Sequence, residues 1–131
     1  MDNQRSHYTS GAQWESRVGY SRAVKVGNII EVSGTVATGD AGEVIGDGDA
    51  YLQTKFILQK IESVLLQAGA ELRHVVRTRM FVTDISQWEA HGRAHGEVFA
   101  GINPCTTMVE VKALIAPQYL IEIEATAIIS A

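Results

Sequence analysis

Two amphipathic helical segments, each lying between strand-like runs, place the strongest constraint on how this 131-residue chain can fold. The first covers about residues 50–68, with Asp49 as its N-cap and Gly69 as its stop. The second follows Asp84 and Gln87, which are spaced as a capping box, and runs from 88 to about 101. Apolar or ring side chains recur at helical spacing in both segments: Ile57, Ile61, Val64, Leu65 and Ala68, then Trp88, His91, His95, Val98 and Phe99.

Strand-like runs surround these helices. Residues 21–26 and 29–33 flank Gly27-Asn28, a two-residue turn typical of a β-hairpin. Residues 37–50 are rich in Gly and Asp and indicate a loop, 74–83 form one strand, and 105–111 and 119–129 are interpreted as a closing hairpin. Because each helix lies between strands, both can serve as right-handed crossovers onto one side of a single sheet. The order predicts one domain over residues 1–131, with a mixed sheet covered by two helices on one face.

The other face of this sheet has a mixed composition. In the last strand Ile121, Ile123, Ala125, Ala127 and Ile129 share an apolar face, and Leu120, Glu122, Glu124, Thr126 and Ile128 share the opposite one. In the middle strand Val76, Thr78, Met80 and Val82 oppose Val75, Arg77, Arg79 and Phe81. A solvated face accounts for the charges, whereas a partly buried subunit interface accounts for both the charges and the apolar side chains, so we favour the interface.

Charge and cysteine content exclude several classes of protein. The net charge of −4 and the pI near 5.5 give no electrostatic footprint for nucleic acid, so a nucleic-acid partner is not expected. Cys105 is the only cysteine, which excludes an intrachain disulfide, and we expect a buried or semi-buried thiol. No apolar run approaches the ~20 residues that a membrane helix needs. We expect a cytoplasmic protein with no membrane partner.

Several motifs together resemble the reactive intermediate deaminase family, also called Rid or YjgF-like. They are Gly-Tyr-Ser-Arg-Ala-Val at 19–24, Val-Gly-Asn at 26–28, Val-Ser-Gly-Thr at 32–35, Val-Thr-Asp at 82–84 followed by Trp88, Asn-Pro-Cys-Thr-Thr-Met-Val-Glu-Val at 103–111 and Tyr-Leu-Ile-Glu-Ile-Glu-Ala at 119–125. The resemblance implies a chorismate-mutase-like α+β fold and a homotrimer whose sheets form a central barrel. It also implies small-molecule clefts between the subunits.

The same resemblance implies the residues of the cleft: Tyr20, Ser33, Gly34, Thr106, Thr107, Met108 and Glu122. In active relatives the glutamate positions a water that attacks an imine derived from a 2-aminoacrylate-type enamine, and ammonia is released. The position of Thr106 carries an arginine that grips the substrate carboxylate in those relatives. A threonine lacks the bidentate cationic grip of an arginine, so the resemblance implies a member without standard 2-aminoacrylate deaminase activity.

Each candidate also has a structural interpretation. Glu122 could pair with Arg77 or Arg79, or either arginine could replace the missing cation of the cleft. Tyr20 could be a packing residue and Gly34 a strand bulge, while Ser33, Thr106 and Thr107 are ordinary strand residues.

His91 and His95 have the i, i+4 spacing of some metal ligands, but a packing or polar role on the helix is favoured. We expect no metal and no cofactor, and no phosphate-binding glycine loop is found in the sequence. Three functions remain: a hydrolase acting on a small imine, enamine or related carbonyl compound, a non-catalytic metabolite-binding trimer, and an endoribonuclease or translation inhibitor. The acidic charge disfavours the third.

Overall fold

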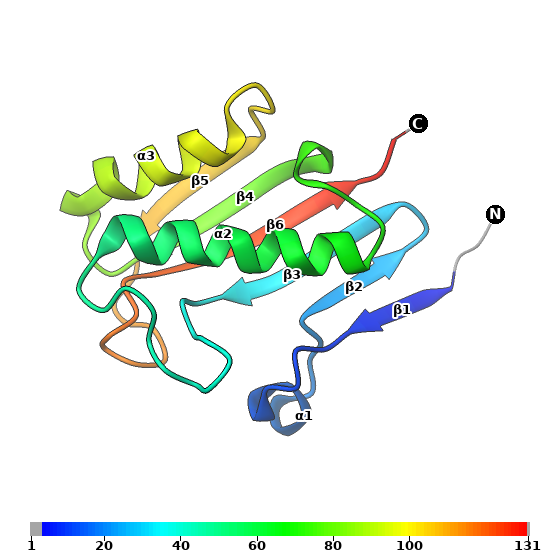
Figure 1. Cartoon of the computed structure of the whole chain (residues 1–131), viewed down its shortest axis with the longest axis horizontal. Helices are drawn as coiled ribbons and strands as arrows, with labels where there is room; N and C mark the ends of the chain where they lie inside the picture. Colours follow the sequence, from blue (N-terminus) through cyan, green and yellow to red (C-terminus); the bar gives the residue numbers. More distant parts are fainter. Residues whose placement is uncertain (1–3, 131) are drawn as a thin grey trace.

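The computed structural model describes residues 4–130, so both ends of the predicted 1–131 domain lie outside the described residues. Figure 1 shows a twisted sheet with helices α2 (Ala50–Gln67) and α3 (Trp88–Phe99) lying across one of its faces. Along the chain the elements are β1 (Arg5–Tyr8), α1 (Gln13–Val18), β2 (Ala23–Val26), β3 (Ile29–Thr35), α2 (Ala50–Gln67), η1 (Leu72–His74), β4 (Val75–Val82), η2 (Ile85–Gln87), α3 (Trp88–Phe99), β5 (Cys105–Glu110) and β6 (Ile121–Ile128). The expected α+β fold is confirmed. β1 and the short helix α1 were not anticipated from the sequence.

The six strands within residues 4–130 form one mixed sheet in the order β1-β2-β3-β6-β4-β5. Among these strands only β4 and β5 pair in parallel. The predicted C-terminal hairpin is therefore wrong, because β5 and β6 lie on opposite sides of β4. The chain runs through α3 between β4 and β5, which allows β5 to join β4 in the same direction, and the segment 111–120 then returns β6 to the centre.

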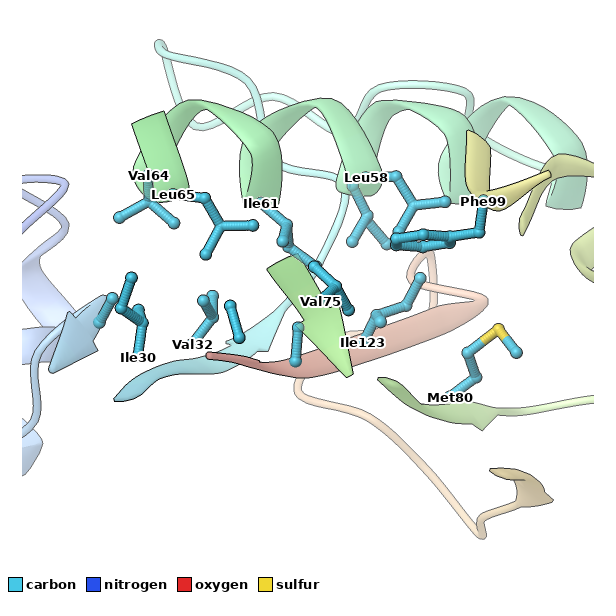
Figure 2. Packing of buried hydrophobic residues seen from close by; sticks show 14 of the residues in the cluster. Ile30, Val32, Leu58, Ile61, Val64, Leu65, Val75, Met80, Phe99 and Ile123 are labelled. Atoms are coloured by element: carbon cyan, nitrogen blue, oxygen red, sulfur yellow. The ribbon is translucent and has the colours of Figure 1, made fainter. Parts of the chain in front are cut away.

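The α2 and α3 helices cover one face of the sheet, as expected. Asp49 accepts a hydrogen bond from the backbone N–H of Leu52 at 3.0 Å, and Gly69 follows the helix with φ +86°, so both predicted ends of α2 are confirmed. In Figure 2 the apolar side chains of α2 point toward those of the strands beneath, with Phe99 contributed by α3. The core members drawn and labelled there are Ile30, Val32, Leu58, Ile61, Val64, Leu65, Val75, Met80, Phe99 and Ile123.

The start of α3 differs from the prediction. Asp84 caps the short 3-10 turn η2 by accepting from the backbone N–H of Ser86 at 3.0 Å, and the helix proper begins at Trp88 without a side-chain cap. Trp88 is 56% exposed, so this residue is not part of the buried helical face. Trp88 is thus exposed at the first position of α3, while His91 and His95 are buried.

A bulge in β4 changes which side chains share a face of the sheet. Between β4 and β6 the register shifts at Val75–Arg77, so that Val76 is an extra residue. Val75 is therefore buried beneath the helices and Val76 is exposed, the reverse of the predicted assignment. Beyond the bulge Thr78 and Met80 are buried as expected, and the alternation along β6 follows the prediction from Ile121 to Ala127.

The face of the sheet opposite the helices has no layer over it within the described chain (Figure 1). It carries Glu31, Arg79, Glu122 and Glu124 together with exposed apolar side chains, of which Val26, Ile29, Val109 and Ile128 are at least one-third exposed. We refer to it below as the open face. Within residues 4–130, none of the helices is both long enough and apolar enough to span a bilayer.

Candidate functional site

Glu122 lies near the start of β6, on the open face of the sheet. It is opposite Phe81 of β4 and is half-buried. Burial raises the pKa of its carboxyl above the ordinary value, with a further rise from the nearby Glu124 and an opposing effect from the Arg22 guanidinium. A carboxyl group of this kind accepts a proton more readily than an exposed glutamate, which suits a role in orienting or activating water.

Gly34 lies directly against Glu122. The register between β3 and β6 shifts between Val32 and Thr35, so that Ser33 and Gly34 together form a bulge in β3. A Cβ atom at residue 34 would lie 2.3 Å from Oε2 of Glu122, far inside van der Waals contact. The expected bulge at this glycine is therefore present, and the missing side chain leaves room for the carboxylate.

Arg22 is a cationic residue near Glu122 that was not among the site residues predicted from the sequence. Its Nη2 donates to the carbonyl oxygen of Gly34 at 2.7 Å, and its guanidinium carbon lies 5.8 Å from the centre of the Tyr20 ring. The Nε of Arg22 is buried and makes no hydrogen bond within the described part of the chain. Arg22 lies within the motif at 19–24, but its proximity to Glu122 arises from pairing between β2, β3 and β6 and is not visible in that motif.

Tyr20 and Ser33 complete this group of residues. Tyr20 is 38% exposed and lies beside Arg22. The hydroxyl of Ser33 donates to the backbone carbonyl of Ser21 at 2.7 Å, which ties the bulge to the segment that precedes β2. We call Tyr20, Arg22, Ser33, Gly34 and Glu122 the carboxylate cluster.

The two arginines considered from the sequence have other surroundings. Arg79 pairs with Glu124, with 3.2 Å between Nη1 and Oε1. Among residues 4–130 Glu122 forms no ion pair with Arg77 or Arg79. A shallow hollow of about 210 Å³ lies on the open face next to this pair, with Glu31 and Ser33 in its lining. Arg22, rather than Arg79, is thus the arginine that acts on Glu122.

Thr106 and Met108 lie on the other face of the sheet. Thr106 is exposed on the edge strand β5, and its hydroxyl accepts from the fully buried Thr78 hydroxyl at 2.7 Å. The same Thr78 oxygen is 2.8 Å from Nε2 of His95 on α3, so both side chains face the helices. Met108 packs against the hydrophobic core on this side.

Thr107 and Cys105 alternate with these residues along β5 and lie on the open face, opposite Arg79 and Arg77 respectively. The thiol of Cys105 is exposed, so the expected burial is wrong. The cause is the position of β5: it is an edge strand of the sheet, with β4 alone as its neighbour.

The two helical histidines are polar residues of the interior, as favoured from the sequence. His91 Nδ1 lies 2.8 Å from the Thr54 hydroxyl of α2, while His95 is bonded to β4, so the two rings serve different partners. Burial lowers the pKa of both rings, and the Asp84 carboxylate partly opposes this effect at His91. Across residues 4–130 no group of three or more His, Cys, Asp or Glu side chains is arranged to hold a metal ion.

The predicted site residues thus fall into two groups. Tyr20, Ser33, Gly34 and Glu122 come together on one side of the sheet, and Thr106 and Met108 lie on the other, with β4 between β6 and β5. Thr107 is on the open face but at the edge of the sheet. Within one chain these residues do not line one pocket.

Comparisons with known proteins agree with this architecture. Residues 11–129 match the family described as Endoribonuclease L-PSP. The crystal structure of Rv2704 from Mycobacterium tuberculosis, described as a member of the YjgF/YER057c/UK114 family, is 49% identical, with a TM-score of 0.87 over 96% of this chain and 100% of that one.

Two curated relatives extend the comparison. A RutC family protein of Pyrococcus abyssi is 36% identical over 82% of this chain and 84% of its own length. The 3-aminoacrylate deaminase RutC of Acinetobacter baylyi is 33% identical over 82% of this chain and 85% of its own length. The chain therefore belongs to the endoribonuclease L-PSP family, also known as the YjgF or Rid family.

Proposed function

We propose that this protein is a homotrimeric hydrolase that acts on a small imine, enamine or related carbonyl compound, with Glu122 as the catalytic carboxylate. The observation that carries the proposal is the state of Glu122: a half-buried carboxyl with a raised pKa, held beside an arginine but without an ion-pair partner among the described residues. Desolvation of this kind raises the proton affinity of a general base. The relative named a 3-aminoacrylate deaminase supports the reaction class.

The proposed reaction adds water to a carbon–nitrogen double bond. Glu122 accepts a proton from the water as the water oxygen attacks the imine carbon, and it passes that proton to the imine nitrogen, which gives a neutral carbinolamine. Glu122 then takes the proton of the carbinolamine hydroxyl and delivers it to the nitrogen as the carbon–nitrogen bond breaks. Ammonia leaves and a carbonyl compound remains, so no oxidant or cofactor is consumed.

A cleft between subunits would unite the two groups of site residues. Glu122 lies on the open face and Thr106 on the helix-covered face of the same sheet, so one chain cannot turn both toward a small molecule. The exposed apolar side chains of the open face would be buried if three such faces formed a central barrel. Thr106 of one copy would then meet the carboxylate cluster of another.

Thr106 limits the substrate. The carboxylate of 2-aminoacrylate would meet a neutral hydroxyl in place of an arginine, so we expect its hydrolysis, and that of short amino-acid-derived imines, to be no faster than in buffer. Thr106→Arg is expected to introduce measurable turnover. Robust turnover by the unmodified protein would contradict this expectation and would identify another cation, with Arg22 the first to test.

Glu122→Gln tests the proposal, with a panel of uncharged imines as substrates and ammonia release as the measurement. General acid–base catalysis contributes about 10²–10⁴-fold, so the variant should lose that factor in kcat. Full retention of turnover would remove Glu122 from the reaction.

The same variant has a stability readout. Because the pKa of Glu122 is raised by folding, the folded protein binds more protons than the unfolded one above about pH 4.3, and its free energy of unfolding falls as the pH rises through this range. Glu122→Gln removes that penalty, so we expect it to unfold at the same or a higher temperature than the parent protein at pH 7. If Glu122 forms a structural ion pair instead, Glu122→Gln should lower the melting temperature relative to the parent at pH 7, and by less at pH 4.

A metabolite-binding trimer without catalysis is the second candidate, and the neutral Thr106 favours it. Its signature is saturable binding of an uncharged small molecule with no turnover in either the parent or the Glu122→Gln protein. An endoribonuclease role is disfavoured because a net charge of −4 offers little attraction to phosphates.

A further inference from the structure

Two charged side chains of the open face, Glu31 and Arg77, have no ion-pair partner among residues 4–130. Glu31 on β3 is exposed and accepts a hydrogen bond at 2.6 Å from the neutral hydroxyl of Thr126. Arg77 on β4 takes part in none of the ion pairs of the described chain. Both charges therefore lack a counter-ion within this part of the protein.

The register of the sheet keeps these two charges apart. Thr126 of β6 is the register partner of Glu31 on one side and of Arg77 on the other, so the three residues form a row across β3, β6 and β4. Neighbouring strands lie about 4.8 Å apart, which separates the backbones at the two ends of the row by about 10 Å. No ion pair spans this row in the structure.

Glu31 also lines the shallow hollow of about 210 Å³ on the open face. Arg79 and Glu124 line it too, but their charges compensate each other at 3.2 Å, so the hollow has a net negative charge that comes from Glu31. A water molecule occupies about 30 Å³, so the hollow has room for the end of a long side chain. An arginine suits it, because the planar guanidinium can donate two parallel hydrogen bonds to one carboxylate.

Any protein that covers the open face must provide for both charges. Burying an unpaired carboxylate or guanidinium is costly, so the covering surface must bring a cation to Glu31 and an anion to Arg77. A second copy of this chain brings both. Arg5 also faces this side, but it lies on the outermost strand β1, where a contact between two such faces would leave it at the solvated rim.

We propose that the open face binds a second copy of this chain, with Arg77 of one copy inserted into the hollow of the next, where it pairs with Glu31. This inference rests on the homotrimer of the proposed function and identifies the residues that align neighbouring copies. In a closed ring of three, each copy gives its Arg77 to one neighbour and receives the Arg77 of the other. The pair disfavours partners whose surface carries a single sign of charge, because one of the two residues would then meet a like charge.

Charge reversal tests the pair. Arg77→Glu and Glu31→Arg each place like charges at every contact, so each should weaken assembly at least about a hundredfold, as expected when a desolvated charge loses its partner. Light scattering over a dilution series measures this loss as a change in multiples of the 14.2 kDa chain mass. The variant with both reversals has opposite charges at every contact again and should recover the parent mass.

Arg73→Glu is the control for a change of charge alone. Arg73 pairs with Glu71 at the 3-10 turn η1, where both side chains are exposed, and its reversal should leave the mass unchanged. Recovery by the double variant would also show that neither reversal prevents folding. Single variants that assemble like the parent, or a double variant that dissociates as they do, would overturn the proposal.

A mixture of the two single variants separates the pair from the trimer. Unlike copies have opposite charges at both positions, but a ring of three must place two copies of one variant side by side. The mixture should therefore assemble less tightly than the parent. Full assembly at twice the chain mass would retain the Arg77–Glu31 pair and reject the trimer, whereas a trimeric parent whose single variants stay trimeric would retain the trimer and reject the pair. These masses do not depend on turnover, so a failure of Glu122-dependent hydrolysis would reject the enzyme alone.

Discussion

The Glu122 carboxylate fills the space that a side chain on residue 34 would need: a Cβ atom on Gly34 would lie 2.3 Å from Oε2 and 2.9 Å from the carboxyl carbon of Glu122. Gly34 does not have a positive φ, so its backbone conformation is accessible to any residue. The requirement for glycine comes from the carboxylate and not from the backbone. The bulge in β3 therefore accommodates the Glu122 side chain of β6.

Gly34→Ala should displace the Glu122 carboxylate with little loss of stability. The contact involves the end of a flexible side chain, so we expect the free energy of unfolding to change by less than about 1 kcal/mol while Glu122-dependent turnover or ligand binding is lost. Gly39→Ala is the matched control, because a Cβ there would lie 2.3 Å from Oε1 of Glu43, outside the carboxylate cluster. Equal function in the two alanine variants would show that the position of the Glu122 carboxylate is unimportant.

Arg22→Gln should raise the pKa of Glu122 further. The Arg22 guanidinium lowers that pKa against the larger effect of burial, so its removal leaves burial and Glu124 unopposed. The carboxyl carbon resonance of Glu122, followed by NMR through a pH titration, reports the change directly. Arg17→Gln is the control, since Arg17 stacks on Trp14 in α1. A Glu122 pKa unchanged by Arg22→Gln would mean that the two charges do not interact.

Acidification should destabilise the protein as the pH falls below about 6.5, the ordinary pKa of histidine. Burial lowers the pKa of His91 and His95 in the folded state, so the unfolded chain binds protons first and the free energy of unfolding decreases. Urea denaturation between pH 7.5 and pH 5.5 measures this slope. A variant with both histidines replaced by glutamine should show a shallower slope, and an identical slope would assign the acid sensitivity to other groups.

Ile128→Arg should disrupt the proposed trimer. Ile128 is 37% exposed on the open face, where the proposed assembly would bury an unpaired charge. Light scattering after size exclusion should change from three times the chain mass of 14.2 kDa to lower multiples. Leu66→Arg, at a residue of α2 that is 58% exposed, should leave the mass unchanged. A parent protein with the mass of one chain would reject the trimer and the cleft between its subunits.

Local sequence determined much of the helical layer. Asp49, the apolar stripe from Ile57 to Ala68 and Gly69 specify α2 through capping, periodicity and a left-handed stop, all of which act within a few residues. The alternation from Ile121 to Ala127 likewise predicted the buried face of β6. The motifs from Gly19 to Glu124 were enough to identify the family.

Tertiary structure alone decided which side chains contact one another in the candidate site, because these contacts depend on which distant strands become neighbours. The sequence suggested that β6 is a hairpin partner of β5. In the structure β6 lies between β3 and β4 instead, and this position brings Arg22 and Gly34 to Glu122. The bulge at Val76 reverses a face assignment that strict alternation predicts, and α3 brings His95 to Thr78. A side chain's own sequence neighbourhood specifies its helix or strand, but strand order and register specify its contacts, and these are set by the packing of the whole sheet against its helices.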